Sequence, residues 1–178
     1  KIQKEKRAAL RRIIADQDVR DALIFCNRKR DIGTLYLSMK KHGYSVGQLH
    51  GDMTQPARME MLKRFKNNEF NYLICSDVAA RGLDIPALSH VFNFDVPNQA
   101  EDYVHRIGRT GRAGVQGHAF TIAISEDINS LKAISKLIGK KIPLFEDKKN
   151  SVLRDIKGHT NSKKFKKSML VRGTKLKK

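Results

Sequence analysis

Short apolar runs recur along most of this chain, at intervals that leave room for a helix between them. Five runs have the length of a single strand, at residues 22–26, 45–49, 71–75, 90–94 and 117–124. Most of them are apolar at successive positions rather than at every second one, which is typical of parallel strands buried on both faces. The pattern therefore predicts at least five buried strands.

The segments around these runs carry apolar residues at spacings of three and four, the pattern of one buried helix face. Such segments lie near the start of the chain, around Leu10, Ile13 and Ile14, and again at residues 29–42, 56–66, 100–107 and 128–138. Pro56 fits a first helical position, and Met59, Leu62 and Phe65 are expected to form the buried stripe of that helix. Strands and helices that alternate with short connections predict an α/β fold, with helices on both faces of a parallel sheet of five or more strands.

The pattern stops after Pro143, and positive charge takes its place. Residues 148–178 hold twelve lysine or arginine residues and one acid, a net charge of +11. The whole chain carries a formal charge of +18, so the remaining +7 is spread over residues 1–147. A highly charged segment without a lasting apolar period does not form a packed core. We expect residues 1–147 to form one domain and residues 148–178 a flexible basic tail.

Charge and composition limit the class of protein. The strong positive charge predicts a polyanionic partner, with nucleic acid favoured over an acidic membrane surface. No run approaches the length of a membrane span and the N-terminus is not apolar, so we expect a cytoplasmic protein without a membrane contact. Because the first residue is not Met, we expect a fragment whose partner domain lies elsewhere.

Cys26 and Cys75 each end an apolar run and are expected to be reduced core thiols. The scattered histidines predict no metal site.

Polar, glycine-rich segments directly follow several strand runs, which is where ligands bind in parallel α/β folds. The phosphate-cradling motif G-x-x-x-x-G-K-[ST] is not found in the sequence. Instead, Arg106, Arg109 and Arg112 stand three residues apart, with glycines between them. Guanidinium groups bind phosphate oxygens in a bidentate way, and glycines let the main chain approach closely. From the residues alone, this cluster is either a basic surface turn or a phosphate clamp for a nucleotide held mostly by another surface.

Four segments, taken in order, resemble motifs of the DEAD-box RNA helicases. Tyr103–Arg112, Tyr-Val-His-Arg-Ile-Gly-Arg-Thr-Gly-Arg, resembles their sixth motif, and Ser76–Ile85 resembles the fifth with serine in place of the usual threonine. Leu23–Arg28 resembles the fourth motif, and His50–Arg58 the segment between the fourth and the fifth. The resemblance covers most of the chain and looks closest to bacterial members. It implies the second of two RecA-like domains of an ATP-dependent RNA helicase, whose first domain would carry the P-loop and the Asp-Glu-Ala-Asp motif.

The resemblance also implies an ATP site that this chain only completes. Arg109 and Arg112 would be catalytic arginine fingers that reach the γ-phosphate when the two domains close. Gly82 and Asp84 would bind the nucleotide as well, the carboxylate by accepting a hydrogen bond from a ribose hydroxyl. The Mg²⁺ ligands would lie in the first domain, and this chain alone is expected not to hydrolyse ATP.

RNA would be bound through its sugar-phosphate backbone, without reading of the base sequence. The resemblance implies RNA contacts by Arg28, Gly51, Gln55, Arg58 and Ser76, and coupling between the two domains by His105, Arg106 and Asp77. The basic tail would act as a non-specific RNA tether. The fragment alone is expected to be a monomer.

Plainer interpretations stay open. Asp84 could cap a turn, Arg58 could lie on a solvated helix face, and His50 could position its loop structurally. For the whole chain, the alternatives are a basic module that binds RNA without meeting ATP and a DNA-directed motor of a related superfamily. The start of the sixth motif and the segment at residues 50–52 favour RNA over DNA.

Overall fold

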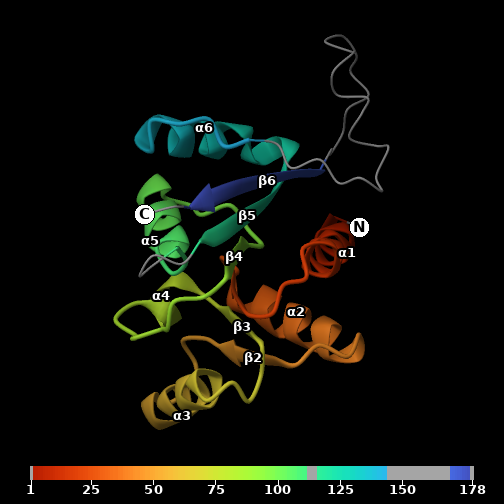
Figure 1. Cartoon of the computed structure of the whole chain (residues 1–178), viewed down its shortest axis with the longest axis vertical. Coiled ribbons are helices and arrows are strands. Elements are labelled where there is room, and N and C mark those ends of the chain that lie inside the picture. The colour runs from red at the N-terminus through yellow and green to blue at the C-terminus, as the bar shows by residue number, and fades with distance from the viewer. Residues whose placement is uncertain (1, 112–115, 144–168, 177–178) are drawn as a thin grey trace.

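The computed structural model describes residues 2–111, 116–143 and 169–176, the last of these ranges as backbone only (Figure 1). Its helices are α1 (Ile2–Asp16), α2 (Lys29–Lys41), α3 (Gln55–Lys66), α4 (Asp77–Ala80), α5 (Ala100–Ile107) and α6 (Ile128–Leu137), with one 3-10 turn at Ser125–Asp127. Its strands are β1 (Ala22–Phe25), β2 (Val46–Leu49), β3 (Tyr72–Cys75), β4 (His90–Asn93), β5 (Gly117–Ile124) and β6 (Met169–Leu176). The five predicted strands all form within one residue of their predicted ends. In the described part of the chain, no helix is long and apolar enough to cross a membrane.

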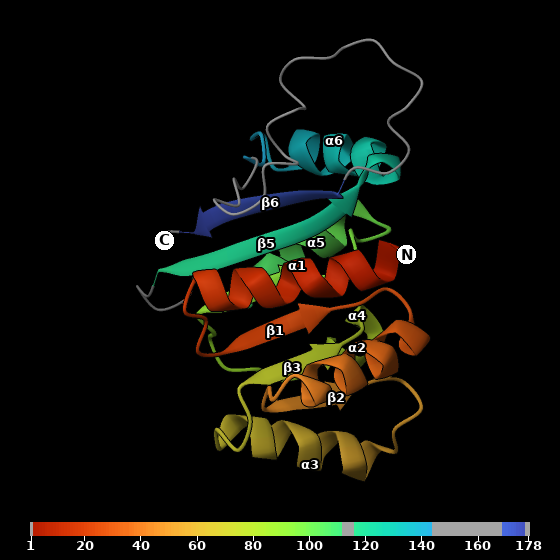
Figure 2. The same cartoon turned by 90° about the vertical axis from the view of Figure 1, so that its right-hand side faces the viewer.

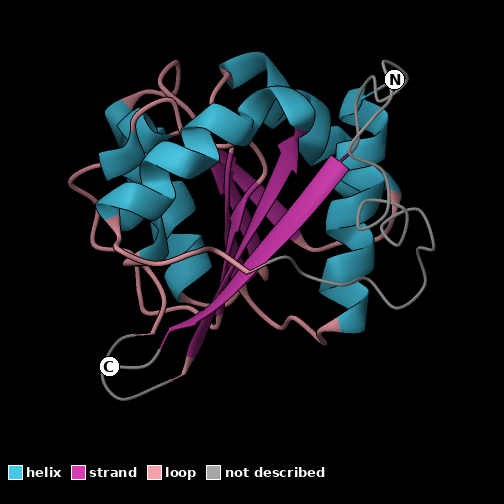
Figure 3. Ribbon diagram, turned by 90° about the horizontal axis from the view of Figure 1, so that it is seen from above, coloured by secondary structure: helices cyan, strands magenta, loops and turns pink. Residues whose placement is uncertain are grey.

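The strands form a single sheet in the order β2-β3-β1-β4-β5-β6. Strands β1 to β5 are parallel, and Ile24 of the central strand β1 lies opposite Ile74 of β3 on one side and Phe92 of β4 on the other. After β1 the chain runs toward the β2 edge, returns through β3, and then continues on the opposite side with β4. The strand order therefore reverses at β1, and Figure 3 shows the sheet between two layers of helices.

Alternate residues of the central strands face opposite sides of the sheet. Ile24 joins a cluster with α1 and α2, in which Leu10 and Leu35 are fully buried. Its neighbour Leu23 packs on the other side with Leu62 of α3. A third cluster joins β5 to α5 and α6 on that side, and Figure 2 shows α1 and α2 on the near face. The predicted arrangement of helices on both faces of a parallel sheet is confirmed.

The buried stripe of α3 differs from the prediction at one position. Leu62 and Phe65 are buried as expected, but Met59 is exposed. Arg58 lies four and seven residues before these two residues, so it shares their side of the helix. Arg58 is half-buried and takes the place in the stripe that the sequence pattern assigned to Met59, which also argues against a merely solvated Arg58.

Strand β6 differs from the expectation of a flexible tail. Residues 169–176 run antiparallel to β5 along its whole length, with Met169 opposite Ile124 and Leu176 opposite Gly117. The segment contains some β-formers, but its pairing depends on the open edge that β5 offers, and that edge is invisible in the local sequence. The rest of the predicted tail up to residue 168 lies outside the described residues.

Candidate nucleotide and RNA interface

The carboxyl ends of the three central strands meet at one edge of the sheet. Asn27 comes soon after β1, Ser76 and Asp77 follow β3, and Asp95 follows β4. In parallel α/β folds, ligands bind at this edge, next to the strand where the order reverses. That strand is β1, so the residues singled out in the sequence lie where the topology favours a binding site.

Arg106 of α5 fills the centre of this edge and is 1% exposed. Its guanidinium donates to the two carboxylate oxygens of Asp77 at 2.7 and 2.6 Å and to Oδ1 of Asn27 at 2.8 Å. Its Nη1 also donates to the main-chain oxygen of Asp95 at 2.8 Å and to Oδ1 of Asn93 at 3.3 Å. This one buried side chain ties α5 to the ends of all three strands, and it brings together Asp77 and Arg106, two of the predicted coupling residues.

The short helix α4 is fixed from two sides. Ser76 Oγ accepts a hydrogen bond from the Ala79 N–H at 3.3 Å and so caps the start of the helix. From α3, Arg58 Nη2 donates to the main-chain oxygen of Ala79 at 2.9 Å. The Nε of Arg58 is buried and has no hydrogen-bond partner among the described residues. Two residues predicted to bind RNA therefore use hydrogen bonds to hold α4 in place.

The loop after α4 carries Gly82 and Asp84, the two residues predicted to meet ATP beside the arginines. Gly82 has a φ of +72°, a left-handed conformation that favours glycine, and nothing lies within 4 Å of the place where a Cβ would be. The Asp84 side chain is 93% exposed and forms an ion pair with Lys66 of α3, with 2.7 Å between Nζ and Oδ2. Arg109 Nη1 donates to the main-chain oxygen of Leu83 at 3.2 Å. The loop thus brings a guanidinium, a carboxylate and accessible main chain together.

A pocket of about 390 Å³ opens beside this loop, between α4 and α5. Its lining includes Phe25, Asp77, Ala80, Arg81, Asp102, Val104, His105, Arg106, Gly108 and Arg109. Arg81 and Asp102 form an ion pair at 3.6 Å, and His105 is exposed. Val78 on α4 and Val104 on α5 also expose apolar surface. A pocket of this volume falls in the range of small-molecule sites, and its mixed charge suits a polar ligand.

The remaining residues predicted to bind RNA lie at the ends of β1 and β2. Gly51, in the loop after β2, and Gln55, the first residue of α3, are both exposed, and open space surrounds the position of a Cβ on Gly51. Arg28 is exposed immediately before α2. Next to it, Lys29 forms an ion pair with Asp52. These residues form an exposed polar rim along the same edge of the sheet.

The second predicted finger, Arg112, lies outside the described residues. Just before it, the buried Thr110 donates its hydroxyl to the main-chain oxygens of Leu88 and Ser89, the latter at 3.1 Å. These bonds fix the chain directly after Arg109. Within the described residues, no group of three histidine, cysteine or acidic side chains could hold a metal ion.

Comparison with known proteins gives the family. The model of the helicase conserved C-terminal domain matches residues 5–114. The chain is 41% identical over 152 residues to the ATP-dependent RNA helicase RhlB of Salmonella paratyphi B, covering 85% of this chain and 36% of that protein. The structure resembles the Escherichia coli DEAD-box protein SrmB, solved with regulator of ribonuclease activity A, at a TM-score of 0.73 and 35% identity over 78% of this chain and 81% of that chain. This chain is a C-terminal helicase domain of the DEAD-box family.

A third relative adds ligands to the comparison. Saccharomyces cerevisiae Dbp5, solved with RNA and ADP BeF3, matches at a TM-score of 0.70 and 34% identity over 78% of this chain and 37% of that chain. The helicase domain spans about a third of the length of the curated relatives that it matches. The predicted RecA-like fold and family are thereby confirmed.

Several residues of the site received no role from the sequence, namely Lys6, Asn27, Lys66, Asn93 and Asp95. Asn93 carried a signal, because a polar residue inside an otherwise apolar strand needs a buried partner. Lys6 carried one too, since it precedes Leu10 by four residues and so continues the buried stripe of α1. Lys66 carried none, because its role depends on a loop that is distant in the sequence.

Both cysteines are buried, unpaired thiols of the core, as predicted. Burial raises the pKa of the Cys26 thiol well above its ordinary value, and burial is also the main cause of the raised pKa of the Cys75 thiol. A thiol that stays protonated is a poor nucleophile and a poor metal ligand. Their contribution is therefore to packing.

Proposed function

We propose that this domain is the half of an ATP-dependent RNA helicase that closes over ATP and RNA, while a first domain supplies the P-loop and the Mg²⁺ ligands. The observation that carries the proposal is the hydrogen bond from Arg109 to the Leu83 oxygen at 3.2 Å. It fixes a permanently charged guanidinium on the loop that also presents Gly82 and Asp84. A module that only bound RNA would gain nothing from this combination.

Arg109 would act on ATP through its charge. In phosphoryl transfer, negative charge spreads over the phosphoryl oxygens, and a guanidinium already in place stabilises it. Gly82 would let the nucleotide lie against the main chain. Asp84 would exchange Lys66 for a ribose hydroxyl, which costs little because an exposed ion pair contributes about 1 kcal/mol or less. Arg112, by resemblance, would be the second finger.

The RNA backbone would lie along the exposed rim. Arg28 offers a charged contact to a phosphate, while Gly51 and Gln55 offer main-chain and amide groups that require no particular base. Ser76 and Arg58 extend this rim toward β3. Because both already form bonds to Ala79, a phosphate would compete with α4 for them, which would link RNA binding to the neighbouring ATP loop. The similarity to Dbp5, which was solved with both RNA and ADP BeF3, supports a site of this double kind.

Coupling between the two domains would run through the pocket. His105 is exposed beside it, so it can meet a first domain, whereas Arg106 is buried and bound to Asp77. Contact at His105 would therefore be transmitted along α5 to Arg106 and then to α4. The exposed Val78 and Val104 would supply apolar surface for the closed state.

The test joins this chain to a DEAD-box first domain and measures ATP hydrolysis at saturating RNA. Arg109→Ala should lower kcat by about a hundredfold or more, the usual effect of losing one transition-state donor. Arg109→Lys should recover only part of this, because an ammonium lacks the planar fork. Arg20→Ala is the matched control, since Arg20 is exposed just before β1, at the opposite edge of the sheet.

The RNA-binding module is the competing function, and the same variants separate the two. If Arg109→Ala turns over ATP like the wild type while Arg28→Ala weakens RNA binding, the domain binds RNA without acting on ATP, and our proposal is wrong. Loss of turnover with RNA affinity retained supports it.

A further inference from the structure

Lys6 is an unusual lysine, because it is 4% exposed, whereas Lys4, the other lysine of α1, is exposed. Lysines are almost never fully buried unless they are paired. Its Nζ lies 2.5 Å from Oδ1 of Asp95 and 4.9 Å from the centre of the Phe94 ring. The ammonium of this α1 residue therefore lies at the end of β4, beside the group of residues that Arg106 binds.

Asp95 joins Lys6 to that cluster. One carboxylate oxygen binds Lys6, and the other accepts the Asn27 main-chain N–H at 3.1 Å. Both oxygens are therefore occupied, and Arg106 reaches only the main-chain oxygen of Asp95. Asn27 links Asp95 to Arg106, because its main-chain N–H donates to Asp95 and its side-chain Oδ1 accepts a hydrogen bond from Arg106 at 2.8 Å.

Two cations and two carboxylates meet here, and the pairing between them is selective. Lys6 forms its ion pair with Asp95, and Arg106 forms a bidentate ion pair with Asp77. We propose that Lys6 is a positioning residue, which occupies the Asp95 carboxylate so that Arg106 stays bound to Asp77. The consequence for ATP turnover rests on the function proposed above, but the positioning itself does not.

Removal of Lys6 should redirect Arg106. In Lys6→Met, the Asp95 carboxylate, 13% exposed, would lose its cation. A buried charge without its partner is costly, and Arg106, already bound to the Asp95 main chain, is the cation within reach. Its guanidinium would turn toward Asp95 and loosen its bond to Asp77, and with it the position of α4.

The first experiment uses the 178-residue chain and the ¹⁵N NMR signal of the Arg106 Nε–H, assigned by its loss in Arg106→Lys. Lys6→Met should shift this signal and speed its exchange with solvent by about tenfold or more. Asp95→Asn should leave it nearly unchanged, because Asp77 is intact. The double variant Lys6→Met/Asp95→Asn should restore the wild-type signal, since no carboxylate then competes for Arg106.

Two controls make this pattern specific. Lys4→Met removes an exposed lysine from the same helix and should leave the Arg106 signal in place. If Lys6→Met does not fold, the folded double variant still decides, because a disturbed Arg106 signal there contradicts the proposal. An undisturbed signal in folded Lys6→Met overturns it outright.

The second experiment places the same variants in the protein joined to a first domain. Lys6→Met should lower RNA-stimulated kcat by about tenfold with a smaller change in KM for ATP, and the double variant should recover the rate. If the wild-type joined protein hydrolyses no ATP while Arg106 still responds to Lys6, the proposed function fails and the positioning role stands. If turnover depends on Arg109 but Lys6→Met has no effect on Arg106, the positioning role fails alone.

Discussion

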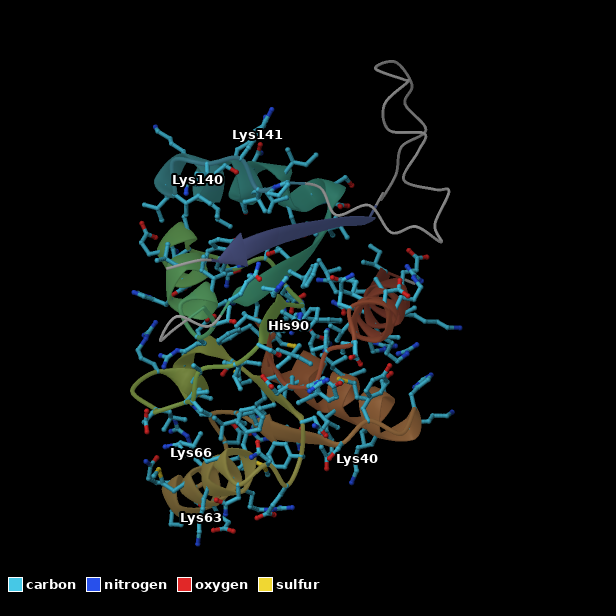
Figure 4. All side chains as sticks on the ribbon, viewed as in Figure 1. Lys40, Lys63, Lys66, His90, Lys140 and Lys141 are labelled. Carbon is cyan, nitrogen blue, oxygen red and sulfur yellow. The ribbon has the colours of Figure 1, made fainter. Side chains whose placement is uncertain are left out.

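Acidification should destabilise this domain through His90, which lies at the start of β4, in the interior of the molecule (Figure 4). The residue is 8% exposed, and its ring stacks on that of His118 at 5.1 Å and near that of Phe120 at 6.2 Å between centres. The pKa of His90 is lowered from 6.5 to about 4, mainly by burial and also by the neighbouring His118, while Asp21 opposes the shift. The folded state therefore favours the neutral imidazole.

The sign and size of the effect follow from this shift. Above pH 6.5 the ring is neutral in both states, and the stability linked to His90 is fully present. Below that value the unfolded chain binds the proton first, so the free energy of unfolding falls until the pH reaches the folded pKa of about 4. At 1.36 kcal/mol per pKa unit, the total loss is at most about 3 kcal/mol, of which about 2 kcal/mol is lost by about pH 5.

The assay is urea unfolding followed by far-ultraviolet circular dichroism at about pH 7.5 and about pH 5, a range that avoids most carboxylate titration. His90→Phe keeps a flat ring in the stack and removes the titration, so its stability should fall by about 2 kcal/mol less than that of the wild type over this range. His42→Gln, at the exposed end of α2, is the control and should behave like the wild type. An equal loss in the wild type and His90→Phe would refute the reasoning.

Two further predictions concern activity and RNA. The chain alone should hydrolyse ATP no faster than a blank, because it has no phosphate-cradling loop; robust turnover by the pure chain would contradict the two-domain account. Replacing the four lysines of residues 163–167 by glutamine, which leaves β6 intact, should reduce the slope of log affinity for single-stranded RNA against log salt by up to about three. Fluorescence anisotropy over a salt series measures this, and an unchanged slope would mean that these lysines do not contact RNA.

Much of the fold could be predicted because buried parallel strands leave a strong local signal. The run at residues 22–26 is apolar throughout, since both of its faces are covered, and α5 was found with its observed ends. Helix α4 was missed because four residues cannot show a helical period. Strand β6 was missed because its partner strand ends 45 residues earlier in the chain, at Ile124, and the cause of pairing is the open edge of the sheet.

The location of the site could be predicted from the sequence more easily than its side-chain contacts. Parallel topology alone places Asn27, Asp77 and Asp95 at one edge of the sheet, but it does not say that β1 lies between β3 and β4. Only that order puts Arg106 within reach of all three. The choice of partner for each charge likewise depends on how the side chains pack in three dimensions, which no spacing in the sequence encodes.

The charged side chains of the site differ sharply in how firmly they are held. This difference separates residues that position the site from residues that could bind a ligand. Arg106 is 1% exposed and donates five hydrogen bonds, so a ligand could bind it only by breaking this network and leaving the half-buried Asp77 without its cation, which costs free energy. Asp84 is 93% exposed in an ion pair with Lys66 that is worth about 1 kcal/mol or less. A nucleotide would therefore bind to the loop that carries Asp84 and contacts Arg109. Arg106 would instead hold α4 and α5 in place behind that loop. Mutations at these two places should therefore have different effects. Mutations in the loop should lower ligand affinity and turnover, whereas mutations of Arg106 should first disturb the structure at the carboxyl ends of the strands.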